Sequence, residues 1–201
     1  MKEPKPIMSP EEAAAAVRRH GGSLRRVPER LKTPELCMAA VRKNGGALKY
    51  VPDALKTEEM CMDAVMQDGW SLHYVPEELK TEAICLDAVR TDISCNMLEL
   101  VPEKMRTPAV CAVAFRASRG TALRLMPDAL KTPEMCLAAV KWHGNMLQYV
   151  PMDMRTSETC MTAVREYGGA VMYVPENILT EEMCLAAIDP RPGFEVGDWL
   201  N

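Results

Sequence analysis

Cysteine is the residue type in this chain with the greatest capacity for chemistry, and its positions are regular. Seven of the eight cysteines recur at intervals of 24 to 26 residues: Cys37, Cys61, Cys85, Cys111, Cys136, Cys160 and Cys184. Thiolates can bind metals or form disulfides, but no C-x-x-C pair is present. Equivalent residues on packed helices lie about 9–10 Å apart, whereas a disulfide needs Cα atoms within roughly 7 Å. We therefore predict small, buried, hydrophobic cysteines with no metal and no cofactor, and only Cys95, outside the regular spacing, as a candidate exposed thiol.

Other residues that could catalyse a reaction are scattered. The three histidines have no carboxylate or cysteine partner that recurs with them: His20, His73 and His143. The sequence shows no nucleophile–base pair, phosphate-binding loop or paired-carboxylate motif, so we predict no catalytic residue and no enzyme activity. An enzymatic alternative places a site in the irregular part of the chain, at Asp92, Cys95, Arg116 and Arg119.

These residues must be positioned by a repeated segment, T-x-E-x-C-x-x-A-V-R-x-x-G-x-x-L-x-Y-V-P-E-x-L-K. Its copies begin at Ser9, Thr33, Thr57, Thr81, Thr107, Thr132, Thr156 and Thr180. The opening Ser or Thr is a good N-cap, and the apolar spacing that follows predicts one face of a helix. Alanine stands three residues after the cysteine position in every copy, which favours close helix packing.

The second half of each repeat predicts a shorter helix. The glycine after the first helix is expected to end it in a left-handed conformation. The residue before proline disfavours the helical conformation, so we expect one to two helical turns, a kink at Val-Pro and a further turn. Neither helix is stable alone at this length, and stability must come from stacking.

The predicted fold is all-α, a right-handed α/α superhelix of seven to eight 24-residue helix-pair repeats. We expect one solenoid domain over residues 9–188, an N-terminal extension over 1–8, and a C-terminal cap or tail over 189–201.

The motif C-x-x-A-V-x-x-[NDH]-G-x-x-L-x-Y-V-P-E-x-L-K-T resembles the bacterial repeat family called domain of unknown function 4116. Residues 37–57 and 61–81 carry it most clearly, and the resemblance extends over residues 9–188. The fourth copy departs from the pattern by two extra residues and the fifth by one. The resemblance implies a helical repeat protein and implies no activity.

Two columns of basic residues recur with the repeat. One lies five residues after the cysteine position, at Arg18, Arg42, Arg90, Arg116, Lys141 and Arg165. The other precedes each N-cap, at Lys32, Lys56, Lys80, Arg106, Lys131 and Arg155. The first column could bind anions or nucleic acid. Acids three residues before the second column instead predict local ion pairs on a solvated face.

Another column changes its residue type from repeat to repeat. This variable column contains Arg25, Lys49, His73, Glu99, Arg124 and Gln148. In solenoids the fixed columns hold the stack and variable exposed columns contact partners, so these are the candidate partner-binding residues. Trp70 and Trp142 occur once each at their positions, and we add them as candidate interface anchors.

Composition limits the class of protein further. The chain has 201 residues, 24 basic against 28 acidic side chains, and 5% aromatic residues. This charge balance makes nucleic acid a poor partner. We expect no membrane segment, no signal peptide in the first residues, and a cytoplasmic location for so many reduced thiols. The sequence therefore predicts a non-enzymatic repeat scaffold for an unidentified protein partner, with anion or nucleic-acid binding along a basic face as the alternative.

Overall fold

A computed structural model of the chain describes residues 9–91 and 97–188. Of these residues 79% are helical, and the described part contains no strand. The predicted extensions at residues 1–8 and 189–201, and Cys95, lie outside the described residues. The prediction of an all-α repeat fold is confirmed.

Each repeat opens with an α-helix of about three turns. These helices are α1 (Pro10–Arg19), α2 (Pro34–Lys43), α3 (Glu58–Gln67), α4 (Glu82–Thr91), α6 (Pro108–Ala117), α7 (Pro133–Trp142), α8 (Ser157–Glu166) and α9 (Glu181–Ile188). The short helix α5 (Met97–Leu100) follows α4 in the irregular fourth repeat.

The second half of most repeats is a pair of 3-10 helices. The first member of each pair is η1 (Gly21–Arg26), η3 (Gly45–Tyr50), η5 (Gly69–Tyr74), η8 (Thr121–Leu125), η10 (Gly144–Tyr149) or η12 (Gly168–Tyr173). The second member is η2 (Glu29–Leu31), η4 (Asp53–Leu55), η6 (Glu77–Leu79), η7 (Glu103–Met105), η9 (Asp128–Leu130), η11 (Met152–Met154) or η13 (Glu176–Ile178). The residue before proline separates the two members in an extended conformation, as Val51 does at φ −82° and ψ 128°. The expected kink is thus confirmed. Because the proline limits the segment to about two turns, the tighter 3-10 bonding satisfies more backbone groups than an α-helix could.

The N-caps follow the sequence prediction. The Thr33 hydroxyl accepts a hydrogen bond from the backbone N–H of Leu36 at 3.3 Å. The same bond forms at Ser9, Thr57, Thr81, Thr107, Thr132, Thr156 and Thr180. Each cap satisfies one of the donors that a helix N-terminus leaves without a partner.

The expected role of glycine at the end of the first helix is wrong for most repeats. The helix ends at an extended residue, such as Asn44 (φ −158°, ψ 109°), and glycine then begins the 3-10 helix. Within the described residues, φ is positive at two positions, Arg119 (48°) and Gly120 (85°), and both lie in the fifth repeat. That repeat is the one with a single extra residue.

Glycine is needed at these positions because the next repeat lies against it. A Cβ atom on Gly45 would lie 2.6 Å from the carbonyl oxygen of Ala64. We call this the glycine–alanine contact. It recurs, closer still, between Gly21 and Ala40, Gly144 and Ala163, and Gly168 and Ala187. The glycine therefore lets the two repeats approach closely, and the atom it meets is a backbone carbonyl oxygen of the following repeat. The repeated alanines Ala40 and Ala64 are fully buried.

The core is a column of small and branched residues along each first helix. Cys37, Ala40 and Val41 of α2 are fully buried, as is Leu48 of η3. Equivalent buried residues recur at Cys61, Ala64, Val65 and Leu72, and at Cys136, Ala139, Val140 and Leu147. At these lengths, burial against neighbouring repeats stabilises helices that would not form alone.

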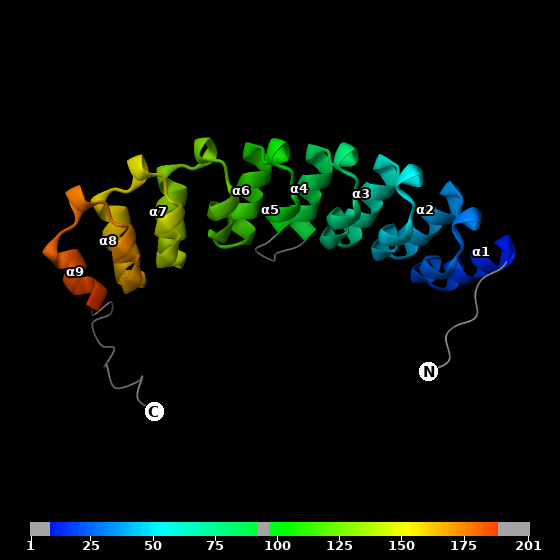
Figure 1. Cartoon of the computed structure of the whole chain (residues 1–201), viewed down its shortest axis with the longest axis horizontal. Coiled ribbons are helices and arrows are strands. Elements are labelled where there is room, and N and C mark those ends of the chain that lie inside the picture. Colours follow the sequence, from blue (N-terminus) through cyan, green and yellow to red (C-terminus); the bar gives the residue numbers. More distant parts are fainter. Residues whose placement is uncertain (1–8, 92–96, 189–201) are drawn as a thin grey trace, which may run out of the picture. The chain divides into compact units, whose positions relative to one another are not determined.

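The chain divides into two compact units, Met1–Val113 and Ala114–Asn201. In the first, α1 to α4 lie side by side in chain order, and η1, η3 and η5 pack both on their own α-helix and on the next (Figure 1). In the second, α7, α8 and α9 follow one another in the same way, with η10 and η12 between them.

Candidate functional site

A cleft in the first unit lies between the first two repeats. Its volume is about 510 Å³, within the range of small-molecule sites. It is lined by His20, Gly22, Ser23, Arg25, Arg26, Asn44, Gly46, Lys49 and Tyr50. We call it the basic cleft, because its lining includes three residues with permanent positive charge and neither aspartate nor glutamate.

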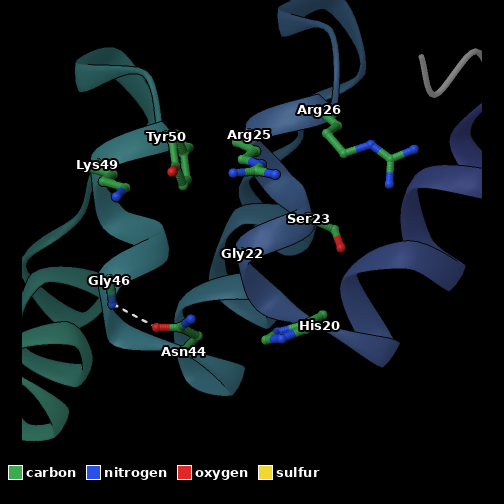
Figure 2. A pocket seen from close by; sticks show the side chains of 9 residues that line it. All are labelled: His20, Gly22, Ser23, Arg25, Arg26, Asn44, Gly46, Lys49 and Tyr50. Carbon is green, nitrogen blue, oxygen red and sulfur yellow. Dashed lines mark hydrogen bonds between the residues drawn. The ribbon is translucent and has the colours of Figure 1, made fainter. Parts of the chain in front are cut away.

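Local chain geometry places the lining residues. His20 and Asn44 are the residues at which α1 and α2 end, and the Asn44 side chain accepts a hydrogen bond from Gly46 N–H at 3.0 Å. Arg25 and Lys49 occupy the last turns of η1 and η3. Figure 2 shows His20 and Asn44 toward one end of the cleft and Arg25, Lys49 and Tyr50 toward the other. The equivalent residues His20 and Asn44, and likewise Arg25 and Lys49, therefore line the same cleft.

At one end of the cleft, the positive charges of Arg25 and Lys49 lie beside the ring of Tyr50. The Lys49 ammonium lies 4.8 Å from the centre of the Tyr50 ring. Tyr50 raises the pKa of Lys49, and the positive charge of Arg25 opposes this rise. Both Arg25 and Lys49 are exposed, so each keeps its charge in contact with solvent.

A second cleft lies between adjacent repeats of the second unit. It measures about 340 Å³ and is lined by Trp142, His143, Gly144, Asn145, Glu166 and Tyr167. Trp142 is 47% exposed and Tyr167 is 52% exposed. One side of Trp142 packs on Phe115, with ring centres 5.8 Å apart. We call this the aromatic cleft.

The predicted partner-binding residues are distributed over both units. Arg25, Lys49, His73, Glu99 and Arg124 are exposed, and Gln148 is half-buried. Arg25 and Lys49 line the basic cleft, and Trp142 lines the aromatic cleft, whereas Trp70 is 48% exposed and lines neither. Sequence reasoning did not assign His20, Ser23 or Asn44 to a site. The available signal was that Arg25 and Lys49 are equivalent basic residues of adjacent repeats.

The first basic column is partly neutralised. Arg42 pairs with Glu59 at 2.8 Å and with Asp63 at 3.0 Å, both in the following repeat. Arg90 pairs with Asp87, and Arg165 pairs with Glu182. The other members are exposed and form no ion pair with another described residue: Arg18, Arg116 and Lys141.

The second basic column has a different role from the one expected. The predicted pairs with the preceding acids form at Lys56, Lys80 and Lys131, for example between Lys56 and Asp53 at 2.7 Å. The lysines are not on a solvated face, however, because the Lys56 side chain is 7% exposed and that of Lys131 is 6% exposed. Lys56 Nζ donates to the carbonyl oxygen of Tyr74 at 2.6 Å, and Lys131 Nζ to that of Tyr149 at 2.8 Å. We call this bond to the following repeat the lysine bridge. It also joins Lys32 to Tyr50 and Lys80 to Leu100, and Arg155 makes it to Tyr173.

The predicted burial of the cysteines is confirmed for the members of the column that have a following repeat. Cys37, Cys61, Cys85, Cys111, Cys136 and Cys160 are buried and free. Burial raises the pKa of Cys61 and of Cys85 to about 11, so these thiols stay protonated at neutral pH. Cys184 on α9 is exposed. Over residues 9–91 and 97–188, no group of three or more His, Cys, Asp or Glu side chains could hold a metal ion.

Stacked repeats of about 24 residues, each an α-helix followed by 3-10 helices, define this molecule as a helical repeat protein. The family model described as Domain of unknown function (DUF4116) matches residues 13–56 and 57–106, so the chain carries repeats of this family, as the sequence resemblance indicated. Neither the curated proteins nor the solved structures gave a match. No helix in the described part of the chain is long and apolar enough to cross a membrane.

Proposed function

We propose that this protein is a non-enzymatic scaffold that binds another protein through its variable column. The observation that carries this proposal is that each repeat uses one set of residues for stacking and leaves a different set exposed. The contacts that hold neighbouring repeats together recur in most repeats, whereas the exposed column beside them changes charge and shape.

The fixed residues are committed to stacking. The glycine–alanine contact, the buried cysteine and the lysine bridge occupy the faces between repeats. Exposed Arg25, Lys49 and His73 are free of these contacts and differ from one another in chemistry. Trp70, 48% exposed and without an assigned role in the stack, adds an aromatic group of the kind that anchors interfaces.

The finer features of the proposal rest on the sequence. We propose that the superhelix is right-handed, as in the sequence prediction. Six buried free thiols support a reducing, cytoplasmic location, and the family resemblance supports a bacterial source.

Anion or nucleic-acid binding along the first basic column is the weaker candidate. Arg42, Arg90 and Arg165 are already paired with acids, which lowers the charge available along that column. A nucleic-acid site of the usual kind relies on several unneutralised basic groups.

The test is partner capture with matched variants of the first unit. One variant carries Arg25→Ser, Lys49→Ser and His73→Ser in the variable column. The control carries Arg30→Ser, Glu78→Ser and Lys104→Ser, which are exposed residues of η2, η6 and η7. Proteins enriched by the wild-type chain are identified by mass spectrometry, and a purified candidate is then titrated against all three chains by calorimetry.

The proposal expects a direct complex that the first variant weakens at least roughly tenfold and the control leaves within about twofold. Equal binding by the first variant and the wild-type chain would overturn it. So would steep loss of binding with added salt together with capture of nucleic acid, which supports the alternative.

A further inference from the structure

We propose that the basic cleft binds a phosphate group carried by a small, multiply charged ligand. This is a different activity from protein binding, although it uses Arg25 and Lys49 of the same variable column, and it concerns a cleft of about 510 Å³ between the first two repeats. That volume suits a small molecule.

Charge is the first argument. Arg25 and Lys49 come from equivalent positions of adjacent repeats and lie at the same end of the cleft (Figure 2). Neither forms an ion pair with another described residue, and no carboxylate lines the cleft. Two like charges held near each other are stabilised by an anion that contacts both.

Polar groups elsewhere in the cleft suit the rest of a phosphorylated ligand, because His20 and Asn44 lie toward the end opposite Arg25 and Lys49 (Figure 2). Ser23, Asn44 and His20 line the same cleft and supply a hydroxyl, an amide and an imidazole. A phosphate has several acceptor oxygens, and guanidinium and ammonium groups bind it through short, charge-assisted hydrogen bonds. A single carboxylate would use fewer of these donors.

The charge is local, which favours a compact anion over a long one. Along the variable column the basic pair Arg25 and Lys49 is followed by His73 and then by Glu99. A polyanion such as nucleic acid, following the column, would meet a carboxylate two repeats further on. A small phosphorylated ligand needs only the one cleft.

Glycine supports the presence of a ligand space. A Cβ atom on Gly22 would have only the Asn44 side-chain amide within 4 Å, at 3.8 Å. The neighbouring Gly21 is required by stacking, because its Cβ would collide with the Ala40 carbonyl oxygen. Gly22 is therefore not needed for packing, and its lack of a side chain keeps the cleft open.

The experiment is a calorimetric titration of the full chain with pyrophosphate at low ionic strength. Three variants accompany the wild type: Arg25→Gln, Lys49→Gln and, as the control, Arg30→Gln. Arg30 is exposed in the same repeat and lies outside the cleft lining, so its loss changes net charge equally. Thermal melting followed by circular dichroism establishes that each variant is folded and whether pyrophosphate raises its Tm.

We expect one pyrophosphate per chain and a higher Tm in its presence. Arg25→Gln and Lys49→Gln should each weaken binding roughly tenfold, and Arg30→Gln should change it by less than about twofold. No binding by the folded wild-type chain would overturn the proposal, as would equal weakening by Arg30→Gln. Tighter binding of oligonucleotides with increasing length would also overturn it. Because the partner-capture test reads a different ligand, failure here leaves the scaffold proposal to stand or fall on its own result.

Discussion

The basic cleft and the aromatic cleft occupy the same kind of junction, between the helix end of one repeat and that of the next, yet their chemistry differs. The first is lined by Arg25 and Lys49 with no acid, and the second by Trp142, Tyr167 and Glu166. Beneath both lies the glycine–alanine contact, Gly21 with Ala40 in one and Gly144 with Ala163 in the other. The comparison teaches that stacking fixes the base of each junction and leaves its exposed residues free to vary.

The largest expected effect tests whether the glycine–alanine contact stabilises the two junctions equally. Gly21→Ala and Gly144→Ala should each lower the free energy of unfolding by about 2–3 kcal/mol, because the new methyl group meets a backbone carbonyl that cannot move aside. Chemical denaturation measures the change. Gly22→Ala is the matched control and should be neutral or stabilise by up to about 1 kcal/mol, since space exists for the methyl group. A large loss of unfolding free energy at only one junction would show that the glycine–alanine contact does not stabilise both junctions equally.

The lysine bridge provides the second test. Lys56→Met and Lys131→Met keep the aliphatic chain but remove the donor to the Tyr74 and Tyr149 carbonyl oxygens. We expect each to cost about 1–2 kcal/mol in the free energy of unfolding, similar in the two units. Lys104→Met, at an exposed lysine of η7, is the control and should change stability by less than about 0.5 kcal/mol. Unchanged stability in Lys56→Met would mean that the bridge contributes nothing to stacking.

A comparison of Trp142 with Trp70 separates the effect of packing on stability from the effect of exposure. Trp142 and Trp70 are almost equally exposed, at 47% and 48%, but Trp142 also packs on Phe115. Trp142→Ala should therefore cost about 1 kcal/mol or slightly more, and Trp70→Ala less than about 0.5 kcal/mol. Equal losses, measured by thermal or denaturant unfolding, would contradict a structural role specific to Trp142.

The last prediction concerns pH and applies only in alkaline solution, because these thiols are protonated in both the folded and the unfolded chain at neutral pH. Burial raises the pKa of Cys61 and Cys85 from 9.0 to about 11 in the folded chain. Above pH 9 the unfolded chain loses these protons first, so the stability that the protonated thiols contribute declines up to about pH 11. The double variant Cys61→Ala and Cys85→Ala should decline less steeply across this range than the wild type. Cys184→Ala, at an exposed thiol, should decline as the wild type does.

The sequence predicted the elements well because their causes are local. The Ser or Thr cap, the residue before proline and the period of apolar residues act within a few positions of themselves. The role of Gly45 was missed because glycine at a helix end ordinarily signals a left-handed residue, whereas here it answers a contact with Ala64 of the next repeat. The burial of Lys56 was missed for the same reason, since its second partner, Tyr74, lies 18 positions along the chain.

The candidate site was only half predictable. The variation along one column indicated that Arg25 and Lys49 are exposed, and this is confirmed. That the residues ending α1 and α2, His20 and Asn44, line the same cleft depends on how one repeat lies against the next. Such placement follows from packing distance and not from residue type.

The glycine–alanine contact has a consequence for how such a gene can grow. Most repeats contain both partners of the contact, a glycine for the repeat that follows and an alanine for the one before, although the fourth repeat has no glycine. The basic residue of the lysine bridge and the carbonyl oxygen that it meets are likewise both present in most copies, with Leu179 at the lysine position of the seventh. A segment duplicated in frame therefore already contains the residues that pack against its neighbours on either side. The chain can lengthen by copying, and mutation is then free to rewrite the exposed residues of each new copy one at a time.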